Sequence, residues 1–147
     1  MSGPQGPIEP ELRAERPIDQ NVRIGHVHLR TADIDRVRDF YVGILGFDVV
    51  HEARGVPGWG TTGDILFVSA GGYHHHVAFN TWRGEGVGPA PAGTVGLRHW
   101  TVELETEEQL AVVGARLRAS GIEAEPGEPG FLVRDPWRNA VRFTARD

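Results

Sequence analysis

The chain has 147 residues, 39% of them hydrophobic and 24% charged, which is the size and composition of one soluble globular domain. A formal net charge of −5 argues against a nucleic-acid surface, and no run of about 20 apolar residues could cross a membrane. Cysteine and lysine are absent, which excludes thiolate and Schiff-base chemistry and leaves seven histidines and twenty carboxylates as the main reactive groups.

Residues 1–21 have the composition of a flexible polar tail interrupted by proline, without the apolar region of a secretory signal peptide. We therefore expect a cytoplasmic protein whose single folded domain spans residues 22–145. Two segments of this domain look like copies of one unit, the first over about 22–82 and the second over about 95–145. The residues between them, 83–94, are rich in glycine and proline and predict a linker.

Each unit is predicted to open with a strand in which apolar and polar side chains alternate. The strand is Ile24–Leu29 in the first unit and Leu97–Val102 in the second, with His26 and His99 at the same place in each. Alternation puts the apolar side chains on one face and the histidines on the other. Such a strand suits a sheet that packs on helices behind and opens to a ligand in front. We expect the repeat to bring the two histidines together by placing the equivalent strands side by side.

A helix is predicted after each opening strand. In the first unit Asp33 is the expected N-cap, and the helix is expected to end at Gly46. In the second unit Thr106 and Gln109 have the spacing of a capping box, and Gly121 is the expected end. The apolar stripes of the two helices consist of Ile34, Val37, Tyr41, Ile44 and Leu45, and of Leu110, Val113 and Leu117.

Three shorter strands are predicted to complete each unit. We expect them at Phe47–Glu52, Ile65–Ser69 and His74–Asn80, and at Ile122–Glu125, Phe131–Arg134 and Ala140–Thr144. A tight turn at 135–139 joins the last two. The glycine-rich segment 53–64 is interpreted as an ordinary hairpin loop, with a mobile lid as the alternative.

The run GHVHLRTADIDRVRDFYVGILGFDVV, at 25–50, resembles the opening of the vicinal-oxygen-chelate (VOC) superfamily. That superfamily includes glyoxalase I, extradiol (catechol 2,3-) dioxygenases, fosfomycin-resistance enzymes and bleomycin-binding proteins. The segments SAGGYHHHVAFNTW and FLVRDPWRNAVRF are most similar to extradiol dioxygenases and their small single-domain relatives. The resemblance covers about residues 22–145. It implies an α+β fold of two β-α-β-β-β modules that form an open, cup-shaped mixed sheet, and it implies a homodimer.

By that resemblance His26 and His99 take the positions of two metal-binding histidines, and His75 takes that of a histidine that moves protons. The metal implied is Fe(II), with Mn(II) or Zn(II) as alternatives, because two histidines and a carboxylate on one face leave positions open for substrate and O₂. The family's carboxylate ligand falls on Arg142 and its tyrosine falls on Leu132. An arginine cannot ligate the metal and would repel it.

A third, non-standard ligand is therefore expected. Strict alternation along 74–80 would send His75 and His76 to opposite faces and favours His76 as the third ligand, whereas the family spacing puts His75 in the cup. Glu103 is the second choice, with a pairing to Arg142 or simple exposure as its alternatives. Arg142 is then expected to clamp an anionic group of the substrate.

The leading hypothesis is a small-molecule enzyme most similar to ring-cleaving extradiol dioxygenases, with His75, His76 and Arg142 as catalytic residues. The alternative is a metal-free protein of the bleomycin-resistance type that binds an aromatic or anionic small molecule, which Arg142 and Leu132 favour. A glyoxalase-type isomerase comes third, because the matching carboxylate positions fall on Ala78 and Arg142. No nucleic acid or membrane is expected as a partner. The residues expected to line the substrate site are His28, Asn80, Trp82, Thr101 and Arg142.

Overall fold

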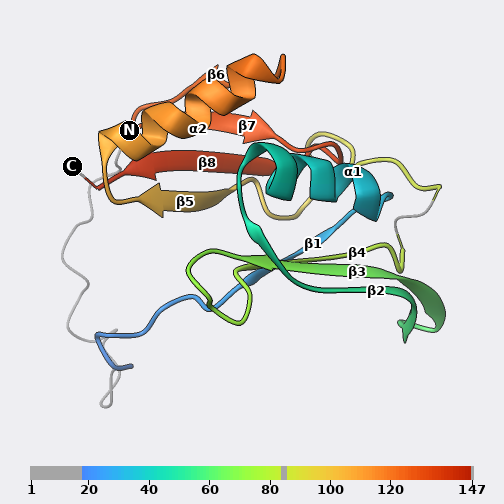
Figure 1. Cartoon of the computed structure of the whole chain (residues 1–147). Coiled ribbons are helices and arrows are strands. Elements are labelled where there is room, and N and C mark those ends of the chain that lie inside the picture. Colours follow the sequence, from blue (N-terminus) through green and yellow to red (C-terminus); the bar gives the residue numbers. More distant parts are fainter. Residues whose placement is uncertain (1–17, 84–85, 147) are drawn as a thin grey trace.

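The computed structural model describes residues 18–83 and 86–146, and most of the predicted tail, residues 1–17, lies outside the described residues. The described chain contains two four-stranded sheets, and helices pack on one face of them (Figure 1). The first sheet and its helices comprise β1 (Val27–Arg30), α1 (Ile34–Arg38), η2 (Asp39–Ile44), β2 (Asp48–Gly58), β3 (Thr61–Ser69) and β4 (Val77–Asn80). The second comprises β5 (Trp100–Leu104), α2 (Glu107–Ala119), β6 (Glu125–Pro126), β7 (Phe131–Arg134) and β8 (Ala140–Ala145).

The two sheets have the same topology. Their strand orders are β1-β4-β3-β2 and β5-β8-β7-β6. In each sheet the opening strand pairs in parallel with the last strand, and the other pairs are antiparallel. The predicted repeat of β-α-β-β-β modules, and with it the α+β fold, is confirmed.

The helices begin where local sequence predicted. The Asp33 carboxylate accepts hydrogen bonds from the backbone N–H groups of Asp35 (2.9 Å) and Arg36 (3.2 Å). Thr106 and Gln109 form the expected capping box at the start of α2. The first helix differs from prediction after Arg38, where it continues as the π-helix η2. No helix of residues 18–83 and 86–146 has the length and apolar character needed to cross a membrane.

The segment 53–64 is part of a long hairpin. β2 extends to Gly58 and β3 begins at Thr61, so only Trp59 and Gly60 remain as the turn. Both have positive φ, 53° and 76°, as a type I′ turn requires. This agrees with the hairpin interpretation, although the strands are longer than predicted.

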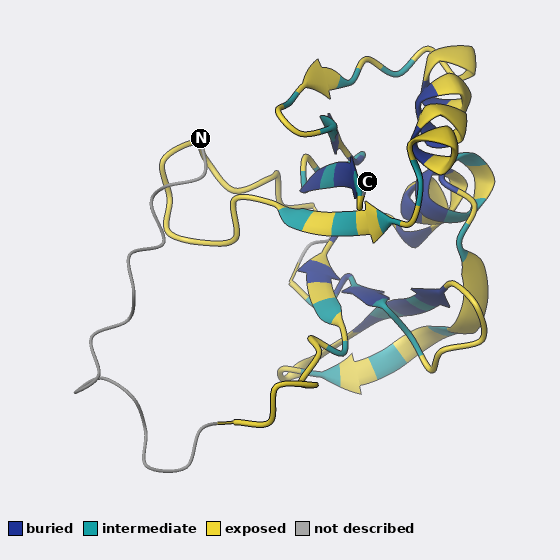
Figure 2. Ribbon diagram, turned by 90° about the vertical axis from the view of Figure 1, so that its left-hand side faces the viewer, coloured by how far each residue is buried: buried dark blue, intermediate teal, exposed yellow. Residues whose placement is uncertain are grey.

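One hydrophobic core joins both sheets and both helices, and Tyr41 of η2 lies at its centre. The ring of Tyr41 packs on Phe79 of the first sheet with ring centroids 4.5 Å apart, and on Trp100 of the second at 6.5 Å. Arg116 of α2 donates to the carbonyl of Leu45 just after η2, over 3.3 Å. Figure 2 shows the buried residues gathered where the helices meet the strands. Each sheet therefore turns one face to this core and the other face away from it.

The opening strands begin later than predicted. Their ladders start at Val27 and Trp100, so residues 24–26 and 97–99 precede the paired region. Because β1 pairs with β4 and β5 pairs with β8, the opening strands lie in different sheets. The expectation that the repeat places these strands side by side is therefore not met within one chain.

Candidate functional site

A row of aligned side chains crosses the face of the first sheet that is turned away from the core. The register places His28 beside Ala78, Ala78 beside Phe67, and Phe67 beside His51, one residue from each strand. Alternate residues of a strand point to opposite faces, so this row lies opposite the core residue Phe79. The row is the base of the candidate site.

Further histidines gather over this row. The ring of His75 stacks on Phe67, with ring centroids 4.7 Å apart and planes 28° apart. The ring of His26 lies 4.5 Å from that of His75, and Nδ1 of His74 is 3.0 Å from Nδ1 of His75. Partial burial, and then the neighbouring His26, lower the pKa of His75 from its ordinary value of 6.5. We use the term histidine face for the surface formed by His26, His28, His51, His74 and His75.

Three residues predicted to line the substrate site meet on the histidine face. Nδ2 of Asn80 lies 2.7 Å from Nε2 of His28, and Oδ1 of Asn80 accepts from the backbone N–H of Trp82 over 3.3 Å. Since the amide oxygen already has its donor, the amide nitrogen donates to an unprotonated Nε2 of His28. Burial, followed by the charges of neighbouring histidines, lowers the pKa of His28 from 6.5, which favours this neutral form.

His76 has a different environment from His75. Its Nδ1 accepts a hydrogen bond from the backbone N–H of Ala70 over 3.1 Å, and its ring packs on Tyr73 with centroids 4.6 Å apart. β4 begins only at Val77, so strict alternation does not extend back through residues 74–76. It is His75 that lies over the aligned row. The role of His76 as a metal ligand stays a prediction, with Nε2 as its remaining nitrogen.

The second sheet carries the equivalent row. The register joins Thr101 to Arg142, Arg142 to Leu132, and Leu132 to Glu125. Through the repeat, these positions correspond to His28, Ala78, Phe67 and His51 of the first sheet. The residues Ala78 and Arg142, which the family pattern placed at carboxylate positions, thus occupy the same place in the two modules.

Arg142 of this row has a hydrogen-bond donor without a partner. Its Nε is buried and has no hydrogen-bond partner within residues 18–83 and 86–146. Its Nη2 approaches Gly127 so closely that a Cβ added there would lie 3.2 Å from it. Glu103 does not supply the missing acceptor, because it pairs with Nε of Arg146 at 2.7 Å, and the predicted alternative of a Glu103–Arg142 pair is wrong. A buried donor with no acceptor costs about 1–3 kcal/mol, so the Nε of Arg142 is an unsatisfied position in the described chain.

The predicted metal ligands His26, His76 and His99 do not assemble in one described chain. Among the residues that the structure describes, no group of three or more histidine, aspartate or glutamate side chains could hold a metal ion. His99 is exposed ahead of β5, and the row bearing Arg142 belongs to the other sheet. Imidazole nitrogens suit Fe(II), Mn(II) and Zn(II), but one chain as described does not complete a ligand set for them.

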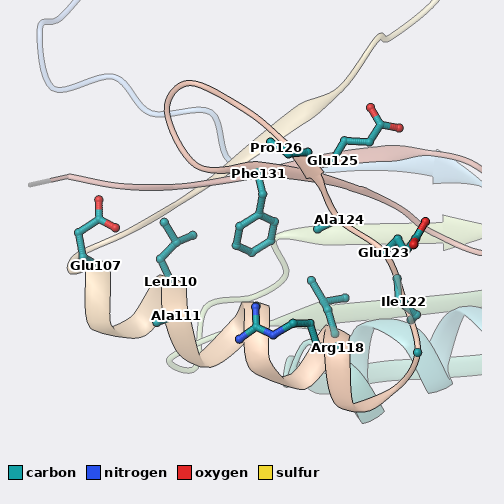
Figure 3. A pocket seen from close by; sticks show the side chains of 13 residues that line it. Glu107, Leu110, Ala111, Arg118, Ile122, Glu123, Ala124, Glu125, Pro126 and Phe131 are labelled. Carbon is teal, nitrogen blue, oxygen red and sulfur yellow. The ribbon is translucent and has the colours of Figure 1, made fainter.

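A hollow of about 930 Å³ lies on the helix side of the second sheet (Figure 3). It opens between α2 and residues 121–126, with Phe131 of β7 beside it. Phe131 alternates with Leu132 along the strand, so the hollow is on the opposite face of the sheet from Arg142. No histidine lines it within the described chain, and it is separate from the histidine face.

Sequence reasoning missed two members of the site, His51 and Phe67. Phe67 has the character of a core residue, and nothing in the strand pattern separates it from Leu66 and Val68. The ladder shifts register between Val49 and His51, so alternation along this strand does not identify the face of His51. The repeat could have found Phe67, because it corresponds to Leu132.

Known proteins match this chain over most of its length. The model of the Glyoxalase/Bleomycin resistance protein/Dioxygenase superfamily matches residues 23–143. A catechol-2,3-dioxygenase of Bacillus subtilis (strain 168) is 41% identical over 113 residues, which are 77% of this chain but only 37% of that relative. A glyoxylase/bleomycin resistance protein/dioxygenase domain from Frankia sp. EAN1pec superposes with a TM-score of 0.70 at 21% identity, covering 84% of this chain and 97% of that one. Glyoxalase I of Leishmania major gives a TM-score of 0.64 at 18% identity, covering 84% and 86%.

Proposed function

The chain belongs to the Glyoxalase/Bleomycin resistance protein/Dioxygenase superfamily, and from this premise we propose that it is a small-molecule enzyme of the ring-cleaving extradiol type with an altered metal site. The observation that carries the proposal is the histidine face, where His26, His28 and His75 meet over an aromatic base. The 41% identity to a catechol-2,3-dioxygenase supports it, over 37% of that relative's length.

The substrate that fits this face is a planar, hydroxylated aromatic ring. Phe67 and Trp82 supply aromatic surface beside His75 and His28. Because the pKa of His75 lies below 6.5, its imidazole is largely neutral at neutral pH and can accept a proton from a phenolic hydroxyl. His28, whose Nε2 accepts from the Asn80 amide, carries its proton on Nδ1 and could donate a hydrogen bond to an oxygen of the substrate.

Arg142 is proposed to bind an anionic group of the substrate, such as a carboxylate. Its buried Nε has no acceptor in the described chain, and a planar guanidinium matches a carboxylate with two parallel hydrogen bonds. The substrate class is therefore a catechol-like ring that carries an acidic substituent. Thr101, paired with Arg142 in the register, would line the same end of the site.

The proposed metal is Fe(II), or Mn(II) or Zn(II), held by His26 and His99 with His76 as the third ligand. A metal bound there would supply Lewis acidity toward the substrate oxygens. Since one described chain does not assemble these ligands, the roles proposed for its own residues are substrate binding and proton transfer.

The second candidate is a metal-free protein that binds an aromatic or anionic small molecule. The position of Arg142 favours it, because an arginine with a buried, unpartnered Nε stands at the position that the family resemblance assigns to the metal-ligating carboxylate. In that case the histidine face and Arg142 would still recognise the ligand, without a reaction.

Elemental analysis decides between the two candidates. The protein, purified without a histidine tag, is incubated with Fe(II), Mn(II) or Zn(II), desalted and measured beside the variants His26→Ala and His99→Ala. We expect about one metal per chain, lost in both variants and kept in His51→Ala, a histidine of the same face that is no proposed ligand. Oxygen uptake should then occur with catechols and be fastest for those bearing a carboxylate. Wild-type protein with metal only at background level would contradict the enzyme and favour the binding protein.

A further inference from the structure

The hairpin of β2 and β3 (Figure 1) carries an exposed tryptophan at its tip. This residue, Trp59, is 73% exposed and is the only tryptophan among the exposed large apolar side chains of residues 18–83 and 86–146. Its φ of 53° is in the left-handed region, where the first position of a type I′ turn favours asparagine, aspartate or glycine. The turn geometry therefore does not explain the indole. A strained backbone under an exposed apolar side chain is typical of a binding site.

Arg83 packs on this exposed indole. Its Cζ lies 5.0 Å from the centroid of the Trp59 ring, which is within the range of a cation–π interaction. A cation–π contact takes up none of the N–H donors of a guanidinium, and such donors can bind a carboxylate with two parallel hydrogen bonds. Trp59 and Arg83 therefore place an aromatic surface and a planar cation side by side.

Trp82 connects this pair to the histidine face. Its ring lies against Gly58 near the tip of the hairpin and against Gly63 of β3. Gly63 and Phe67 are four residues apart on one strand, so they point to the same face, and Trp82 covers the face that holds the base of the candidate site. The ring centroids of Trp82 and His28 are 6.4 Å apart. The histidine face thus continues through Trp82 to the hairpin tip.

We propose that Trp59 and Arg83 form an outer binding subsite for an aromatic ligand that carries a carboxylate. The ring of the ligand stacks on the indole, and its carboxylate accepts hydrogen bonds from the guanidinium. A neutral ring gains the stacking alone, so the pair selects acidic aromatic molecules. Arg142 belongs to the other sheet, so the two arginines are separate points of recognition. The ligand class rests on the proposed function, but the subsite requires neither a metal nor a reaction.

NMR of the indole N–H groups in metal-free protein tests the subsite, with protocatechuate as the acidic probe and catechol as the neutral one. The signal of Trp59, identified by its absence from Trp59→Asn, should shift saturably with protocatechuate. Arg83→Gln should weaken this binding about two- to fivefold, because an exposed ion pair is lost. Calorimetry should show binding about three- to tenfold weaker in Trp59→Asn, because the stacking is lost.

Matched variants separate recognition from stability. Arg134→Gln changes an exposed arginine of the second sheet and should leave the affinity for protocatechuate unchanged. Catechol should bind Arg83→Gln as well as it binds the wild type, since it has no carboxylate. Asparagine suits the turn, so Trp59→Asn should keep or raise the unfolding midpoint, and its weaker binding is then no effect of a damaged fold.

Two outcomes would overturn the subsite. One is a Trp59 signal that does not move with protocatechuate, and the other is equal affinity for protocatechuate in the wild type and Arg83→Gln. In either case the pair only stabilises the hairpin. A protein that binds no metal but shifts its Trp59 signal as expected would contradict the proposed enzyme and support the subsite.

Discussion

Asp135 accepts hydrogen bonds that connect the two modules. Its buried carboxylate accepts from the Tyr41 hydroxyl (2.9 Å), the backbone N–H groups of Trp137 and Asn139, and the side-chain amide of Asn139 (3.1 Å). That amide also donates to the carbonyl of Arg30 in β1. The turn that follows β7 is therefore joined to both η2 and the opening strand of the first module.

Replacing Tyr41 by Phe should lower the free energy of unfolding by about 1.5–3 kcal/mol at neutral pH, because a hydrogen bond to a charged group is lost. Burial raises the pKa of Asp135 from 3.8, and bonds from Asn139 and Tyr41 oppose that rise. Because the pKa of Asp135 is higher in the folded protein than in the unfolded chain, the free energy of unfolding falls as the pH increases above 3.8. Losing the Tyr41 donor raises the pKa of Asp135 further, so the cost of the variant should shrink as the pH approaches 3.8.

Urea unfolding of the wild type and Tyr41→Phe across this pH range measures the effect. The control is Tyr73→Phe, whose partly exposed hydroxyl makes no side-chain hydrogen bond within the described residues and should change stability by less than about 0.5 kcal/mol. An equal cost at every pH would show that the Tyr41 hydroxyl does not interact with ionised Asp135.

Asn80 hydrogen-bonds the imidazole of His28. The amide donates to Nε2 of a neutral imidazole, and the pKa of His28 is lowered from 6.5 by burial and neighbouring histidines. The change Asn80→Asp replaces this donor by an acceptor with negative charge, so it should raise the pKa of His28 relative to the wild type. A histidine NMR titration of both proteins measures it, with Asp48→Asn as a distant control. A His28 pKa that does not rise would mean that the 2.7 Å contact is absent in solution.

At the scale of elements, Trp82 holds the β2–β3 hairpin against β4. Its Nε1 donates to the carbonyl of Val56 over 2.7 Å, and its ring lies against Gly58 and Gly63. A Cβ on Gly63 would lie 2.8 Å from Trp82 Cδ1 and 2.9 Å from Trp82 N, closer than real contacts allow. Because the hairpin backbone faces the ring directly, glycine is required at this position.

Gly63→Ala should therefore destabilise the protein by about 1–3 kcal/mol through overpacking. Thermal unfolding followed by circular dichroism gives the midpoint for comparison with Gly88→Ala. A Cβ on Gly88 meets nothing within 4 Å, so that control should be neutral or slightly stabilising. Equal midpoints for the two variants would show that the ring and the hairpin separate easily.

Local sequence predicted those elements whose ends depend on local bonds. Asp33 and Thr106 mark the helix starts because their side chains cap backbone N–H groups within three residues. Long-range contacts determine the extent of the elements that differ from the sequence prediction. β2 extends past Glu52 because β3 and Trp82 bind its far half, and the π-helix brings Tyr41 between the sheets. Neither contact produces a periodic pattern in the sequence from which it could be predicted.

At the scale of the molecule, the repeat predicted which positions are equivalent but not which faces meet. The equivalence of Ala78 and Arg142 follows from two copies of one strand order, and the register agrees with it. How the modules pack depends on core contacts such as Tyr41 with Phe79 and Trp100, which any single module lacks. The repeat thus singles out His26 and His99 as equivalent positions, while their separation on different sheets could not be predicted from it.

Arg142 carries a buried Nε with no hydrogen-bond partner in the described chain, and we propose that an anionic ligand satisfies it. A buried N–H donor without an acceptor weakens the folded state in the absence of ligand, since this donor loses its hydrogen bond to water and gains no partner. Arg142→Met keeps the apolar stem and removes the charge, and it should raise the free energy of unfolding by about 1–3 kcal/mol. Arg134→Met, an exposed residue near Glu125 at 3.6 Å, should change it by less than about 0.5 kcal/mol.

Urea unfolding with and without an added aromatic carboxylate separates the two effects. The ligand should stabilise the wild type and leave Arg142→Met unchanged, because only the arginine offers the carboxylate a bidentate partner. A variant that is less stable than the wild type without ligand would mean that Arg142 already has its acceptor within the folded protein. In that outcome the arginine would be a structural replacement for the family's metal-ligating carboxylate, and the anionic group of the substrate would have to be recognised elsewhere.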